Sequence, residues 1–155
     1  MIKNIKKITK LNIKEIFELS LQQFKENSWK KEYFEQEITK PLHFAYLYQD
    51  ENSGKIAAFI FFMQTEGDSG LDYNITNLAT DDCFKNLGYA TVLINFCFML
   101  AKKNNMNQVW LEVCEKNSSA LRLYQKLGFK IDYIRKNYYL NQGNALIMSK
   151  KNDFI

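Results

Sequence analysis

The stretch Asn77–Leu93 joins a strand pattern directly to a long helical pattern, and it restricts the fold more than any other part of the chain. It begins as the end of a strand, Ile75–Thr80, passes through two aspartates and turns at Lys85–Gly88 into a helix. Backbone N–H groups at the start of a helix are unpaired and partly positive, and a glycine lets an anion approach them. The stretch therefore predicts a phosphate-binding loop, although an ordinary turn glycine explains the same local pattern.

The composition favours one globular domain over residues 1–155. A chain of 155 residues with 46% apolar side chains can bury a sizeable core. The 21 Lys and Arg residues exceed the 17 Asp and Glu residues by four. They form no basic stripe, so we expect no direct binding to nucleic acid.

The cysteines and the histidine argue against several kinds of site. Cys83, Cys97 and Cys114 lie far apart, which predicts neither a disulfide framework nor a zinc site. His43 is the only histidine, so we expect no bound metal. A hydrolase triad would need His43 as its base, but this residue lies in an alternating, strand-like stretch.

No part of the sequence predicts a membrane segment. No apolar run reaches the length of about 18 residues that a transmembrane helix needs. The N-terminal residues alternate between polar and apolar side chains, unlike a signal peptide. We expect a cytoplasmic protein that does not contact a membrane and is a monomer or a weak dimer.

Periodicity divides the chain into strands and helices without an internal repeat. Strand-like patterns cover Ile2–Thr9, His43–Tyr48, Lys55–Gln64, Leu71–Thr80, Val109–Val113, Lys130–Arg135 and Ala145–Lys150. Helical spacing covers Asn12–Phe24 with a capping box of Asn12 and Glu15, Trp29–Ile38, the segment from Gly88 to Asn104, and Ser118–Leu127 closed by Gly128. Thr65–Gly70 and Lys136–Asn144 are expected to be loops. This order predicts an α/β fold of the α+β kind, a mixed sheet with helices on both faces.

Motifs in the second half resemble a known enzyme family. Lys85-x-x-Gly88-x-Ala90 resembles the Gln/Arg-x-x-Gly-x-Gly/Ala loop with which the GNAT superfamily of N-acetyltransferases holds the pyrophosphate of acetyl-CoA. Asn77-Leu78-Ala79-Thr80 resembles the Asn-Ile-Ala-Val strand end of its RimI-type branch. Further matches to that branch are Trp110-Leu111-Glu112-Val113, Asn117, Ala120, Leu123-Tyr124, Leu127-Gly128-Phe129, Arg135-Lys136-Asn137-Tyr138-Tyr139 and Ala145-Leu146-Ile147-Met148.

The resemblance implies a single GNAT-like domain with a central, mostly antiparallel sheet of about seven strands. It implies acetyl-CoA as co-substrate, no metal, and a protein N-terminus as acceptor, namely the N-terminal alanine of a small-subunit ribosomal protein. The cofactor contacts that it implies are Leu78, Ala79, Thr80, Lys85, Asn86, Leu87, Gly88, Tyr89, Ala90, Thr91 and Asn117. The acceptor contacts that it implies are Trp29, Tyr138 and Tyr139.

For the chemistry, the resemblance implies Glu112 as the base and Tyr124 as the acid that protonates the departing thiolate. An α-ammonium group titrates near ~8 and a free glutamic acid near ~4.3, so direct proton transfer is uphill by roughly 5 kcal/mol. Either the neighbours Leu111 and Val113 make the carboxylate more basic, or water relays the proton.

Each of these residues also has a purely structural explanation. Glu112 fits a solvated strand edge, and Tyr124 fits a tyrosine packed beneath a sheet. Asn117 fits a helix N-cap. Trp29 fits a core anchor, and Tyr138 with its neighbour fits the aromatic cover of a hairpin.

Two other functions fit the same motifs. One is acetylation of a small-molecule amine or of a lysine side chain, and the other is binding of CoA without catalysis. Lys85 departs from the usual Gln or Arg of the family loop, and four further positions depart from the branch: Asn74, Asp82, Cys114 and Lys116. Asn74 and Cys114 are expected near the acceptor, so they bear on its identity more than on the chemistry.

Overall fold

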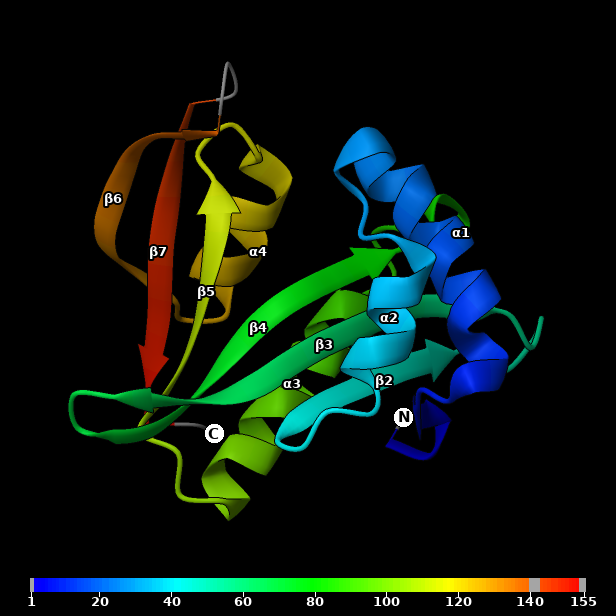
Figure 1. Ribbon diagram of the computed structural model, residues 1–155, viewed down its shortest axis with the longest axis horizontal. Helices are drawn as coiled ribbons and strands as arrows, with labels where there is room; N and C mark the ends of the chain where they lie inside the picture. The colour runs from blue at the N-terminus through cyan, green and yellow to red at the C-terminus, as the bar shows by residue number, and fades with distance from the viewer. Residues whose placement is uncertain (1, 140–142, 154–155) are drawn as a thin grey trace. The chain divides into compact units, whose positions relative to one another are not determined.

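The computed structural model describes residues 2–139 and 143–153 (Figure 1). Its strands are β1 (Ile5–Lys7), β2 (His43–Gln49), β3 (Ile56–Gly67), β4 (Gly70–Thr80), β5 (Gln108–Cys114), β6 (Lys130–Tyr139) and β7 (Gly143–Lys151). Its α-helices are α1 (Ile13–Phe24), α2 (Lys31–Glu37), α3 (Tyr89–Lys103) and α4 (Ser118–Lys126). Short 3-10 turns lie at Ile2–Asn4, Lys10–Asn12, Lys25–Asn27 and Asp82–Phe84. Within the described part of the chain, no helix is long and apolar enough to cross a membrane.

The strands are hydrogen-bonded in the order β1-β2-β3-β4-β5-β7-β6. The pairs β1–β2, β2–β3, β5–β7 and β6–β7 are antiparallel, and β4–β5 is parallel. A parallel pair needs a long crossover between its strands, and α3 lies in that connection. The predicted mixed, mostly antiparallel sheet of about seven strands is confirmed.

Contacts along the chain define two compact units. The first unit comprises Met1–Met63 with Asn77–Cys97, and the second comprises Gln64–Thr76 with Phe98–Ile155. The predicted phosphate-binding loop therefore belongs to the first unit, and Glu112 belongs to the second. The prediction of one domain over residues 1–155 stays a prediction.

The first unit is built on a strand pair that is buried on both faces. Seven consecutive residues of β3, from Ile56 to Phe62, are buried, as the apolar run predicts. Helices α1 and α2 cover one face, where Phe34 packs against Phe59 and Phe61. Helix α3 covers the other face, where Phe96 meets Tyr46 with ring centroids 4.8 Å apart. Figure 1 shows these helices on opposite sides of β2 and β3, which confirms the two covered faces.

The second unit buries one face of β5 and leaves the other partly open. Val109, Leu111 and Val113 are buried, and the alternate residues, including Glu112, are half-buried. Phe129, just after α4, packs with ring centroids 5.6 Å from those of Phe98 and Tyr124. Strand alternation thus places Glu112 on the more open face.

Two predicted loops are mostly strand. Strand β3 continues through Thr65 to Gly67, and β4 resumes at Gly70, whose φ of 132° suits a glycine in a tight turn. Strand β6 continues to Tyr139, which pairs with Gly143, and the register is irregular between Arg135 and Tyr139. Residues 140–142 of the second predicted loop lie outside the described residues. Local polarity misled the prediction, because hairpin pairing with the neighbouring strand stabilises these polar segments.

The predicted capping box of Asn12 and Glu15 is wrong. The Asn12 side-chain oxygen accepts hydrogen bonds from the Thr9 N–H and hydroxyl groups, at 2.9 and 3.0 Å. The Glu15 carboxylate accepts from the Ile56 N–H group at 2.9 Å. The two side chains therefore stabilise the preceding turn and the start of β3 instead of the first turn of α1.

Truncation of Phe34 tests this account of the first core. Phe34 is fully buried among three aromatic rings, those of Trp29, Phe59 and Phe61. We expect Phe34→Ala to lower the free energy of unfolding by about 3–5 kcal/mol, because it leaves a cavity. Urea titration of the purified variant measures this loss. The control Leu11→Ala, at a residue 94% exposed, should change stability by no more than about 0.5 kcal/mol.

Candidate active site

The start of α3 presents unpaired backbone N–H groups beside open space. The first hydrogen bond of the helix runs from the Val92 N–H group to the Gly88 carbonyl, at 3.0 Å. The N–H groups that precede it have no partner within the helix. Gly88 has a φ of 84°, and no atom lies within 4 Å of the position that a Cβ would occupy. The loop therefore has the geometry and the room to accept a phosphate group.

Side chains from α1 hold the loop before α3. The Asp82 carboxylate accepts from the Gln23 side chain at 2.9 Å, and its N–H group donates to Gln22 at 3.1 Å. The Lys85 ammonium lies 2.6 Å from Asp82. The hydrogen bonds from Lys85 and Gln23 lower the pKa of Asp82. Asp82, a departure from the family pattern, thus fixes the loop, and the charge of Lys85 is partly neutralised.

The Tyr89 side chain anchors the first turn of α3 within the first unit. Its hydroxyl group donates to Asp50 at 3.1 Å, and its ring stacks on Tyr48 with centroids 4.4 Å apart. Burial, followed by the hydrogen bond to Asp50, raises the pKa of Tyr89. Its predicted cofactor contact is therefore left to its backbone N–H group.

The other predicted cofactor residues of the first unit lie at the end of β4, in the loop before α3 and in the first turn of α3. Leu78 and Thr80 are half-buried at the end of β4, and Ala79 is buried between them. Asn86 has a φ of 62°, a conformation that asparagine tolerates well. Leu87 is exposed, and Ala90 and Thr91 are half-buried in the first turn of α3.

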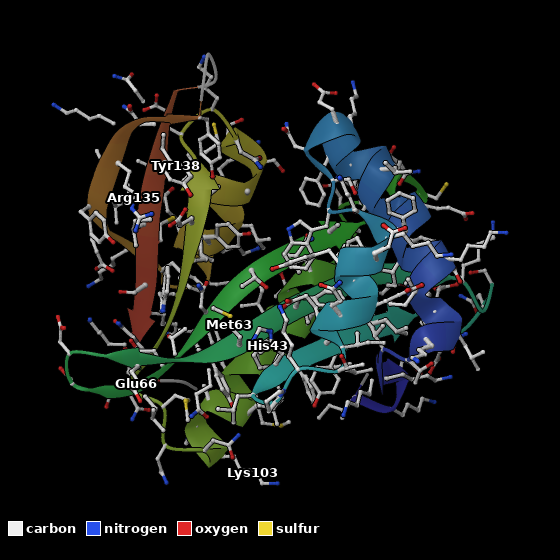
Figure 2. All side chains as sticks on the ribbon, in the orientation of Figure 1. His43, Met63, Glu66, Lys103, Arg135 and Tyr138 are labelled. Atoms are coloured by element: carbon white, nitrogen blue, oxygen red, sulfur yellow. The ribbon has the colours of Figure 1, made fainter. Side chains whose placement is uncertain are left out.

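In the second unit, Glu112 is paired with an arginine. Its Oε1 atom lies 2.9 Å from Nη1 of Arg135. Arg135 also lies over the ring of Tyr138, with 5.5 Å between its Cζ atom and the ring centroid. Figure 2 shows Arg135 and Tyr138 close together on the second unit. The carboxylate that the sequence singles out is therefore not a freely solvated strand-edge group.

Two further tyrosines complete this group. Arg135 makes a hydrogen bond with the side chain of Tyr133, and this bond, followed by the charge of Glu112, raises the pKa of Arg135. Burial, followed by the charges of Glu112 and Cys114, raises the pKa of Tyr139. Tyr138 and Tyr139 meet edge to face at 5.2 Å. We call Glu112, Tyr133, Arg135, Tyr138 and Tyr139 the Glu112 cluster.

Arg135 and Tyr133 were not among the predicted site residues. The sequence offers Arg135 only as one letter of a motif shared with the RimI-type branch. Its relation to Glu112 depends on the registers Glu112–Ile147, Ile147–Tyr133 and Ala145–Arg135. Only the alignment of β6 and β7 would have revealed it.

Tyr124 lies on α4 and is buried. Its burial raises its pKa to about 12, so the hydroxyl group keeps its proton at neutral pH. Asn117 precedes the helix, and its side-chain oxygen accepts from the Ala120 N–H group at 3.2 Å. The N-cap interpretation of Asn117 is thereby confirmed, while its contact with CoA stays a prediction.

Trp29 belongs to the core of the first unit. Its ring centroid lies 4.8, 5.2 and 5.6 Å from those of Tyr33, Phe34 and Phe61. This packing gives Trp29 a complete structural role, as the core-anchor interpretation predicts. Its contact with an acceptor stays a prediction.

His43 is occupied by a structural interaction. Its Nδ1 atom lies 2.7 Å from the buried Glu37, which also pairs with Lys40. Burial opposes the charge of Glu37, but the hydrogen bonds from Lys40 and His43 leave its pKa below the ordinary value. Figure 2 shows His43 beside Met63, its partner across the β2–β3 pair. No metal-binding group of three His, Cys, Asp or Glu side chains occurs among the described residues.

Comparison with known sequences gives a consistent set of relatives. The model of the acetyltransferase (GNAT) family matches residues 12–129. The [ribosomal protein bS18]-alanine N-acetyltransferase of Haemophilus ducreyi is 38% identical over 77 residues, which cover 47% of this chain and 53% of that protein. The protein of that name from Escherichia coli K12 is 32% identical over 92 residues, 59% of this chain and 60% of the relative. The chain thus spans little more than half the length of these relatives.

Solved structures share the fold over nearly the whole chain. The ribosomal-protein-S18-alanine N-acetyltransferase of Escherichia coli aligns with a TM-score of 0.81 and 22% identity, covering 97% of this chain and 94% of that one. Arabidopsis thaliana NAA60, in complex with a bisubstrate analogue, aligns with a TM-score of 0.83 and 14% identity, covering 97% and 98%. These likenesses concern the fold, and the family match covers about three quarters of the sequence. The chain belongs to the acetyltransferase (GNAT) family.

Proposed function

We propose that the protein is an acetyl-CoA-dependent N-acetyltransferase that modifies a protein N-terminal α-amine. The observation that carries the proposal is a contrast within the second unit. Glu112 is a half-exposed carboxylate in an ion pair, whereas Tyr124 is a buried phenol whose pKa is raised to about 12. A carboxylate that solvent can reach and a buried phenol are groups that can serve as general base and general acid. Membership of the acetyltransferase (GNAT) family indicates acetyl transfer as the reaction in which these two groups would act.

The first unit would bind the cofactor. Backbone N–H groups at the start of α3 and the open space at Gly88 suit the diphosphate of acetyl-CoA. The free backbone groups of Leu78–Thr80 would pair with the amides of the pantetheine arm, as an added strand would. Bound acetyl-CoA supplies the acetyl group as an activated thioester. No metal takes part in this proposal.

Glu112 would remove the proton that the acceptor amine must lose. The ion pair with Arg135 holds one oxygen of the Glu112 carboxylate in place. Direct transfer from an ammonium group to a free carboxylate is uphill by roughly 5 kcal/mol, so we propose transfer through water. The remaining exposure of Glu112, 24% of its side chain, leaves access for such a water.

Tyr124 would return a proton to the departing sulfur. With its pKa raised to about 12, the hydroxyl group is still protonated at the pH of ~8 where the acceptor amine becomes neutral. A thiol titrates near ~8.5 in water, so proton transfer from a phenol with a pKa of about 12 is uphill by roughly 5 kcal/mol. The transfer would therefore accompany the breaking of the carbon–sulfur bond, where water does not stabilise the thiolate. No acetylated protein residue is needed, and we propose direct transfer with both substrates bound.

The favoured acceptor is the N-terminal alanine of a small-subunit ribosomal protein, which makes the proposed activity cytoplasmic. The relatives from H. ducreyi and E. coli carry the name of that reaction. Tyr138 and Tyr139 offer aromatic surface beside Glu112 for the first residues of a peptide. Intact-mass measurement of ribosomal proteins from cells with and without the gene tests this choice. One ribosomal protein should lose one acetyl group on deletion, and unchanged masses would exclude this acceptor.

The binding of acetyl-CoA at Gly88 can be tested with two matched glycines. Gly88→Val places a branched side chain in the space beside the helix start, so we expect calorimetric titration to detect no binding. Gly54 has a similar φ, 70° against 84°, and equally open surroundings. Gly54→Val therefore introduces comparable backbone strain away from the loop and should keep wild-type affinity. Binding by Gly88→Val with the affinity of the control would place the phosphates elsewhere.

The pH dependence of turnover distinguishes loss of the acid from loss of the base. Glu112→Gln and Tyr124→Phe should each keep the affinity for acetyl-CoA and lower turnover by roughly 10²–10⁴-fold. The loss in Glu112→Gln should shrink as pH rises past ~8, because more acceptor amine is already neutral. The loss in Tyr124→Phe should be constant, because a phenol with a pKa of about 12 stays protonated throughout. Turnover of an alanine peptide from about pH 6.5 to about pH 9.5 measures both.

The wild-type profile follows from the same reasoning. Because Glu112 accepts the amine proton, the wild-type rate should change less with pH around the pKa of the acceptor amine than the Glu112→Gln rate does, and it should show no alkaline decline in this range. Wild-type turnover in both variants would exclude these residues as acid and base. Tight binding of CoA without turnover of any amine would instead favour a non-catalytic module.

A further inference from the structure

The ion pair between Glu112 and Arg135 uses one oxygen of the carboxylate. Nη1 of Arg135 lies 2.9 Å from Oε1. A carboxylate has two oxygens, and fixing one of them fixes the direction of the other. Arg135 therefore sets where the second oxygen of Glu112 points, and this direction matters if that oxygen accepts a proton.

The path between the two side chains crosses one strand. Glu112 on β5 lies opposite Ile147 on β7, and Arg135 on β6 lies opposite Ala145 on β7. Two strand spacings separate β5 from β6, about 10 Å in the plane of the sheet. Alternation puts Ala145 and Ile147 on the same face as the ion pair, and neither side chain offers a hydrogen-bonding group. Only long side chains can bridge this distance. Because the β7 side chains between them cannot form hydrogen bonds, Glu112 and Arg135 pair with each other.

Arg135 is itself held in place by aromatic rings. Its Cζ atom lies 5.5 Å from the ring centroid of Tyr138 and 6.0 Å from that of Tyr133. The Tyr133 side chain also makes a hydrogen bond with it. An exposed ion pair between two long, mobile side chains is usually weak, because ordering them costs entropy. The rings reduce that cost here, since a planar guanidinium group packs well on aromatic faces.

We propose that Arg135 is a positioning residue for the acetyl transfer, which orients the Glu112 carboxylate toward the incoming amine. The inference rests on the proposed function, in which Glu112 is the base. Because Arg135 acts through Glu112, it contributes to the rate of proton removal and not to the binding of the acceptor. Its removal should therefore lower kcat and leave KM for the acceptor nearly unchanged.

Steady-state kinetics on an N-terminal alanine peptide test this role. In Arg135→Gln we expect kcat to fall roughly 10- to 100-fold, the usual effect of a slightly misplaced catalytic group. KM for the peptide should stay within about threefold of wild type. The control Lys136→Gln removes the neighbouring positive charge of the same strand and should keep wild-type kinetics. Unchanged thermal unfolding of both variants establishes that the fold is intact.

A double variant distinguishes positioning from an independent effect. Arg135→Gln should cause no further loss of kcat when it is added to Glu112→Gln, because the group that it orients is already absent. These measurements are best made near about pH 7, where most of the acceptor amine is protonated and turnover depends on the base. A wild-type kcat in Arg135→Gln, or a full additional loss in the double variant, would overturn the inference.

The outcome is separable from that of the proposed function. If Glu112→Gln loses turnover while Arg135→Gln does not, the proposed function stands and the positioning role fails. If the wild-type protein transfers no acetyl group to any amine, the proposed function fails, and the positioning role is overturned with it.

Discussion

The register of β5, β7 and β6 is the constraint on which the chemistry of the second unit depends. It places Glu112, Tyr133 and Arg135 on one face of three adjacent strands. Because the side-chain period of a strand is two, a slip of β5 by one residue would move Glu112 to the opposite face. The buried face of β5 opposes such a slip, since Val109, Leu111 and Val113 would become exposed. Burial of this apolar set thus also determines the surroundings of the proposed base.

In the first unit, the packing keeps the space beside the start of helix α3 free. Asp82 fixes the preceding loop to α1, and Tyr89 fixes the first turn to Tyr48 and Asp50. These contacts hold the backbone while the space at Gly88 stays free. A preformed anion site of this kind loses little conformational entropy when a ligand binds. In the proposed function, cofactor binding and proton transfer therefore involve separate sets of residues, each with its own packing.

Strong local patterns made most of the fold and part of the site predictable. The apolar run of β3, the glycine before α3 and Asn117 before α4 each have a physical cause within a few residues of sequence. Long-range pairing was not predictable in the same way. It extended β6 through Tyr139, turned Glu15 toward the Ile56 N–H group, and brought Arg135 to Glu112. Local propensity carries no information about the partner strand, and the partner strand determined all three of these features.

The central claim is that this chain transfers acetyl groups to an N-terminal α-amine. It is tested most directly by offering the purified protein acetyl-CoA and one peptide that carries both an N-terminal alanine and an internal lysine. Fragment-ion mass spectrometry then locates any added acetyl group. The account predicts one acetyl group on the α-nitrogen of the alanine and none on the lysine. Acetylation of the lysine instead, or of neither amine, would contradict it.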